Sequence, residues 1–70
     1  MIVHEHTSRF DVLARTRTLP AADARRYVAK QLRELRSHSH KPRSHRNHGV
    51  RYWHVPYNVF DEYVIWLTEV

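Results

Sequence analysis

The clearest pattern along the chain is an amphipathic repeat that runs from residue 20 to residue 36. At the 100° step of an α-helix, the apolar side chains fall within an arc of about 80°, and they are Ala24, Val28, Leu32 and Leu35. Basic side chains fill the opposite side, namely Arg25, Arg26, Lys30, Arg33 and Arg36. A proline in the first turn and Thr18 upstream are typical of a helix start. The pattern predicts one long helix over residues 20–36 with a basic outer face.

Two interpretations compete upstream of this helix. Residues 1–6 and 9–16 predict the two strands of a hairpin, because apolar side chains recur at alternate positions in the second segment. Alternatively, residues 8–15 form a short helix, since Ser8 has an acid three residues further on, the spacing of a capping box. The Thr-rich alternation of residues 15–18 favours the strands.

Residues 37–49 have a composition unlike the rest of the chain. Apart from one proline, they contain only Ser, His, Asn, Lys, Arg and a final Gly49. Such a segment predicts an exposed basic loop rich in Ser and His. Residues 50–55 then predict a strand, because they are rich in β-branched and aromatic types.

The C-terminal segment fits two structures. In residues 58–67 the apolar side chains recur at helical spacing, and Asn58 is a suitable cap for that helix. Residues 63–70 are equally rich in strand-forming types, so a final strand is the alternative. A small domain cannot easily bury both apolar faces of such a helix. Residues 59–67 are therefore expected to form either packed core or a homodimer seam.

Together these elements predict the α+β class: one long basic amphipathic helix packed on a small antiparallel sheet, with an apolar C-terminal helix or strand. A chain of 70 residues forms a single small domain over residues 1–70. A domain of this size buries only about 60% of its unfolded surface, so we expect a thin margin of stability.

Composition removes several classes of protein. The absence of cysteine excludes disulfides, thiolate metal sites and thiol nucleophiles. No apolar run approaches the ~20 residues that span a bilayer, and the first residues lack the basic region of a signal peptide. These features predict a cytoplasmic protein with no membrane partner.

The charge is distributed unevenly. The whole chain carries 12 basic and 7 acidic residues, a net charge of +5 with histidine neutral. All 12 basic residues lie in residues 9–51 with only three acids, whereas residues 52–70 carry three acids and no base. The middle of the chain therefore has the charge of a surface that contacts a polyanion.

This charge predicts a non-enzymatic protein that binds nucleic acid, DNA in preference to RNA, through the helix face and the adjacent loop. Arginine offers a planar fork that suits phosphate or a guanine edge. The residues expected to bind are Arg25, Arg26, Lys30, Arg33, Arg36, Lys41, Arg43, Arg46, Arg51 and Trp53. The alternative is an interaction or inhibitor protein of the phage type, which docks the same basic surface on an acidic or nucleic-acid-binding surface of a larger host protein complex.

Trp53 is included because of strand alternation. Alternation places Tyr52 and His54 on one face of the predicted strand and Arg51 with Trp53 on the other. One face has to meet the helix, and the other is free to stack an aromatic ring on a base. The competing interpretation is that Trp53 or Tyr52 is simply core.

The order of elements resembles that of the small winged-helix excisionases of bacteriophages: a long basic helix, a basic loop, the strand Gly-Val-Arg-Tyr-Trp-His-Val and a final amphipathic segment. The resemblance covers residues 8–68 and concerns element order, not a sequence motif. It implies a winged-helix-like variant of the fold, with the helix over residues 20–36 in the major groove and residues 41–51 as the wing. The chain departs from this family in having no clear first helix and a long loop before the strand.

Seven histidines raise the question of a metal site. His4 and His6 would share one face of a strand, but the other H-x-H pair, His38 and His40, falls in the loop. We expect no physiological metal and no cofactor. Catalysis is also not expected, because one glycine cannot build a phosphate loop and the adjacent acids Asp61 and Glu62 diverge on any regular element.

Overall fold

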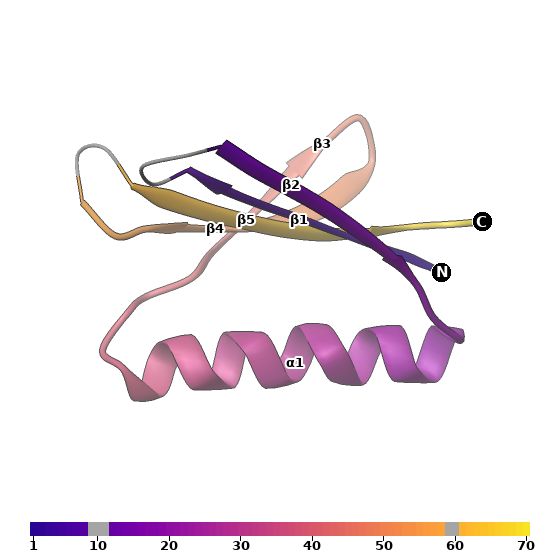
Figure 1. Ribbon diagram of the computed structural model, residues 1–70, viewed down its shortest axis with the longest axis horizontal. Coiled ribbons are helices and arrows are strands. Elements are labelled where there is room, and N and C mark those ends of the chain that lie inside the picture. The colour runs from indigo at the N-terminus through magenta and orange to yellow at the C-terminus, as the bar shows by residue number, and fades with distance from the viewer. Residues whose placement is uncertain (9–11, 59–60) are drawn as a thin grey trace.

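The computed structural model describes residues 1–8, 12–58 and 61–70. Along the chain its elements are β1 (Ile2–Ser8), β2 (Val12–Thr18), α1 (Ala21–Ser37), β3 (Arg43–Asn47), β4 (Val50–Pro56) and β5 (Glu62–Thr68). The strands form one antiparallel sheet in the order β2-β1-β5-β4-β3, and α1 lies along one face of it (Figure 1). The predicted α+β class, with one helix on an antiparallel sheet, is confirmed. No helix within the described ranges is long and apolar enough to cross a membrane.

The N-terminal hairpin forms as its alternation predicts. β1 pairs with β2 from Ile2 opposite Thr18 to Ser8 opposite Val12. The alternative helix over residues 8–15 is wrong, because Val12 onward is strand and the backbone groups of β2 pair with β1. The part of the predicted second strand at residues 9–11 lies outside the described residues.

Helix α1 matches the predicted helix to within one residue at each end. Pro20 takes the capping position in an extended conformation, its carbonyl accepts from the Ala24 amide at 2.9 Å, and no side chain caps the start. The side chains of Ala24, Val28 and Leu32 are buried against the sheet. The helix ends at Ser37, and Ser39 then turns the chain in the left-handed region at φ 68°.

The prediction of a loop throughout residues 37–49 needs a correction, because residues Arg43–Asn47 form the edge strand β3. All five residues of β3 are exposed, so composition alone gave no sign of a strand. Pairing with β4 creates it, and a two-residue turn at His48 and Gly49 joins the two strands. Both turn residues have positive φ, 50° and 77°, as a tight hairpin turn of type I′ requires.

The C-terminal segment is a strand, and the helical alternative is wrong. β5 lies in the middle of the sheet between β1 and β4, where Tyr63 and Ile65 bury on the helix side. Asn58, expected as a helix cap, instead closes the turn before β5: its Oδ1 accepts from the Asp61 amide at 2.9 Å, and its Nδ2 donates to the Asp61 carboxylate at 3.0 Å. Residues 59 and 60 of the proposed dimer seam lie outside the described residues.

The core is a single layer between α1 and the sheet. Within the described ranges its buried members are Val3, Ala24, Val28, Leu32, Val55, Tyr63 and Ile65. The opposite face of the sheet, here called the open face, has no described element packed over it (Figure 1). Nothing in the described residues shows the winged-helix variant, since α1 is the one helix that they contain.

A polar cluster fastens one side of α1 to the sheet. Glu5 on β1 accepts a hydrogen bond from the Tyr27 hydroxyl at 2.5 Å and another from the Tyr63 hydroxyl at 2.9 Å. The Arg17 guanidinium lies 4.9 Å from the centre of the Tyr27 ring. Burial raises the pKa of Tyr63 far above its usual range, and the hydrogen bond and negative charge of Glu5 raise it further. Burial and Glu5 also raise the pKa of Tyr27, while Arg17 and Arg15 oppose that rise.

The raised pKa of Tyr63 predicts a loss of stability in alkali. Below pH ~10 Tyr63 is protonated in both states, so its contribution is fully present. Above that pH the unfolded tyrosine ionises and the buried one does not, so the free energy of unfolding falls by up to about 1.4 kcal/mol per pH unit. Urea unfolding between pH 9 and 11.5 should show a shallower decline for Tyr63→Phe than for the parent, and equal slopes would contradict the assignment.

Candidate nucleic-acid interface

The predicted cations of α1 form one exposed surface. Because Ala24, Val28 and Leu32 face the sheet, the side of the helix opposite these residues points to solvent. Every basic residue expected to bind there is exposed: Arg25, Arg26, Lys30, Arg33 and Arg36. We call this set the helix cations.

The helix cations have few carboxylate partners. Arg26 lies 3.4 Å from Asp23, an exposed pair of the kind that contributes little to stability. In the described ranges, no other helix cation forms an ion pair with a carboxylate. Like charges at spacings of three and four residues, such as Arg26 with Lys30, cost a few tenths of a kcal/mol per pair. An anionic partner would remove that repulsion.

The hairpin β3–β4 carries the second group of predicted cations. Arg46 and Arg51 are directly opposite each other in the register, so their side chains share the face of the sheet that bears the helix. The Arg51 Nε donates to the Ser44 hydroxyl at 2.7 Å, which holds that guanidinium over the hairpin. Arg43 alternates to the open face, and Lys41 is exposed in the segment before β3. The hairpin therefore presents arginine on both of its faces.

Trp53 lies on β4 between the hairpin and α1. As alternation predicts, it lies with Arg51 on the helix side of β4, and it packs partly buried against the core. The Arg51 guanidinium lies 5.1 Å from the centre of the Trp53 ring. The packing of Trp53 against the core agrees with the interpretation of Trp53 as a core residue. Because Arg51 also covers one face of the indole, less of the ring is left to stack on a base.

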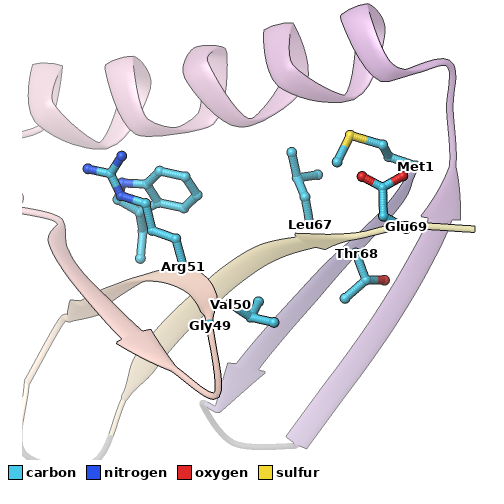
Figure 2. A pocket seen from close by; sticks show the side chains of 8 residues that line it. Met1, Gly49, Val50, Arg51, Leu67, Thr68 and Glu69 are labelled. Carbon is cyan, nitrogen blue, oxygen red and sulfur yellow. The ribbon is translucent and has the colours of Figure 1, made fainter.

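Two shallow hollows flank Trp53 beneath α1. Figure 2 shows the larger, of about 320 Å³, with Arg51, Leu67 and Met1 around it and Glu69 at the end near the N-terminus. The smaller, of about 180 Å³, lies against the helix and is lined by Arg25 and Leu32 as well as Trp53. Three predicted site residues, Arg25, Arg51 and Trp53, are therefore brought together. Arg26, Lys30 and Arg33 point away from these hollows, on the outward side of the helix.

Sequence reasoning missed the side chains of the open face. Alternation places His4, Tyr52 and Trp66 there, from three different strands. The available signal is the strand-forming composition of residues 63–70, which competes with the helical spacing of residues 58–67.

The histidines do not converge. The His4 Nε2 hydrogen-bonds the Thr68 hydroxyl at 2.7 Å, and the His54 Nε2 lies 2.9 Å from a Glu62 carboxylate oxygen. Among the residues that the structure describes, no three His, Asp or Glu side chains gather where they could hold a metal ion. Four of the histidines, His4, His40, His45 and His54, hydrogen-bond or contact an aromatic ring.

No family model matches this chain, and the searches found neither a curated protein nor a solved structure that is similar to it. Any function has to be argued from the chemistry of the surfaces described above.

Proposed function

We propose that this protein is a small non-enzymatic protein that binds nucleic acid, DNA in preference to RNA, through the helix cations and the adjacent β3–β4 hairpin. The observation that carries the proposal is the exposure of all five helix cations on one face with a single carboxylate partner among the described residues. A phosphate backbone would supply the anion that four of these five cations lack among the described residues.

The arrangement favours backbone contacts over reading of base edges. Arginine dominates the helix cations, and its planar fork can contact two phosphate oxygens at once. Side-chain amides, which read adenine, are scarce in the chain: Gln31, Asn47 and Asn58. Gln31 is half-buried on α1 and Asn58 is engaged with Asp61. Asn47 is therefore the one side-chain amide that is exposed and has no side-chain hydrogen bond within the described ranges. The affinity should therefore depend strongly on charge and only weakly on the base sequence.

The hairpin supports the same proposal from a second direction. Arg46 and Arg51 share the face of the sheet on which α1 lies, so cations from both elements border the space around Trp53. A backbone that follows the outer side of α1 can extend onto this hairpin. An acidic surface of a larger protein is the competing partner, and charge alone does not separate the two.

A pair of charge-matched variants tests the helix surface. Lys30→Ala/Arg33→Ala removes two helix cations without breaking a hydrogen bond or ion pair seen in the structure. Arg15→Ala/Arg17→Ala removes the same charge from β2, and circular dichroism checks that both variants fold. Fluorescence anisotropy with a labelled DNA duplex at 50 mM salt should show at least a tenfold loss for the helix variant and a smaller loss for the β2 variant. The slope of log K against log salt should also become shallower by about 2 in the helix variant.

Two results would count against the proposal. Equal losses in both variants would indicate a general charge effect and no helix surface. Failure of the parent to bind duplex DNA, single-stranded DNA or RNA at 50 mM salt would favour an acidic protein partner.

A further inference from the structure

We infer that the open face of the sheet holds a slot for one unpaired nucleobase, between the rings of Trp66 and Tyr52. This site is on the opposite side of the sheet from α1 and uses none of the helix cations. It adds single-stranded nucleic acid to the partners of the protein, and it stands or falls separately from the proposed function.

The register of the sheet places four rings in one row across four strands. His4 on β1 is opposite Trp66 on β5, and Trp66 is opposite Tyr52 on β4. Tyr52 is in turn opposite His45 on the edge strand β3. Directly opposed residues on neighbouring strands project from the same face, so these four side chains form a ladder of rings. We call it the ring ladder.

The ring ladder is stacked at both ends and open in the middle. His4 and Trp66 are parallel, with an interplanar angle of 1° and ring centres 4.9 Å apart. Tyr52 and His45 are stacked at 5.2 Å and 25°. No ring contact joins Trp66 to Tyr52 within the described ranges, although their backbones are directly paired. The row of stacked rings is therefore interrupted between Trp66 and Tyr52.

A hollow of about 430 Å³ occupies this gap. Trp66 and Tyr52 form two of its walls, Val50 and Val64 line it, and Asn47 at the end of β3 and His48 in the hairpin turn complete it. Its volume falls within the usual range for small-ligand sites, and aromatic and aliphatic walls with a few polar groups are typical of them. Since His4 covers one face of the Trp66 ring, the other face is directed to this hollow.

The chemistry of the slot suits a nucleobase. Every base has a flat π-face, and stacking on an aromatic side chain contributes about 1–3 kcal/mol per base without depending on sequence. The Asn47 amide provides both a donor and an acceptor for a base edge. Within the described ranges, Glu62 is the only carboxylate that alternation places on the open face, and it is engaged by His54 at 2.9 Å. Arg43, on the same face, offers a cation to the phosphate that accompanies the base.

The bound base has to be unpaired. In a duplex each base is covered above and below and hydrogen-bonded to its partner, so a protein ring reaches its face only after unstacking. The slot therefore selects single strands, loops or ends. A second copy of the chain is the competing occupant of this face, and it becomes an outcome of the test.

The first measurement uses tryptophan fluorescence. Trp53 and Trp66 are the two tryptophans of the chain, so Trp53→Phe leaves Trp66 as the sole reporter in the ring ladder. The probes are an eight-nucleotide thymidine oligonucleotide and an oligonucleotide of the same length and charge made of abasic residues. Saturable quenching by the thymidine probe and none by the abasic probe is the expected result. Equal responses to the two probes would overturn the slot.

The second measurement compares affinities for the two probes by competition. In the parent, the thymidine probe should bind about tenfold or more tightly than the abasic probe. Trp66→Leu and Tyr52→Leu should each reduce that ratio toward one, whereas Lys30→Ala/Arg33→Ala should leave the ratio unchanged. A ratio that survives in both ring variants, or a dimer in analytical ultracentrifugation that dissociates in Trp66→Leu, would contradict the base slot.

Discussion

Raising the salt concentration from 50 to 200 mM is expected to weaken binding to duplex DNA by roughly 250- to 1000-fold. The helix cations and hairpin arginines can neutralise about five phosphates, which predicts a slope of about −4 to −5 for log K against log salt. A fourfold rise in salt then lowers the affinity by a factor of four raised to the fourth or fifth power. Anisotropy titrations at four or more salt concentrations measure this slope directly.

Base stacking in the slot on the open face provides the control for this salt dependence. Stacking releases no counterions, so the ratio of affinities for the thymidine and abasic probes should change little over the same salt range. A duplex slope shallower than about −2 would mean that two phosphates or fewer are neutralised. The helix cations would then be a solvated surface that keeps the protein soluble.

The helix and the first hairpin could be predicted because each depends on a period within one segment. In α1 the apolar residues recur every three or four positions and are interrupted by arginine, which leaves no strand alternative. In β1 and β2 the two-residue alternation decides the face of each side chain. Residues 58–67 fit the helical period and residues 63–70 are equally strand-forming, and only the position of β5 between two partner strands selects the strand.

The edge strand β3 could not be predicted in the same way. Its five residues are all exposed, so no buried face leaves an apolar pattern. The only local indication is the turn, where Gly49 at φ 77° permits a tight hairpin. Pairing with β4 contributes the rest, and that pairing is a property of the folded chain.

For the candidate sites, the sequence indicates which side chains are exposed but not which of them are neighbours. The helix cations follow from helical periodicity alone, and the structure places each of them at the surface. The ring ladder combines residues 4, 45, 52 and 66. Alternation assigns each ring to a face, but a shift of two residues in any register would separate the row. For this reason the sequence predicted Trp53 as a binding residue, although it packs against the core, and did not predict Trp66.

The two candidate surfaces lie on opposite sides of the sheet, and the β3–β4 hairpin is the element that belongs to both. Arg46 and Arg51 project to the helix side, whereas Arg43 and His45 project to the open face. A single strand that passes around this edge would contact cations on each side and place a base in the slot. A duplex would be limited to the helix side.

Ile65→Ala is expected to remove about half of the stability of the fold. Ile65 is fully buried in the central strand, where it lies between Glu5 on β1 and Trp53 on β4. Truncation of a buried isoleucine to alanine costs about 2–5 kcal/mol, because the apolar contacts are lost and a cavity remains. A domain of this size has only about 4–10 kcal/mol in total. Urea unfolding should show this loss, and Val70→Ala, whose side chain is 87% exposed, should change stability by less than about 0.5 kcal/mol.

The same variant separates loss of folding from loss of binding. A ligand that binds only the folded state, present at 100 times its dissociation constant, stabilises that state by about 2.7 kcal/mol whatever the starting stability. Duplex DNA at that excess should therefore raise the unfolding free energy of Ile65→Ala and of the parent by equal amounts. A smaller gain in Ile65→Ala would mean that the cavity beneath Trp53 also distorts the binding surface, so that packing in the core and binding at the surface are coupled. An equal gain would show that the core only has to hold α1 and the hairpin in place, and that the exposed cations then bind by charge alone.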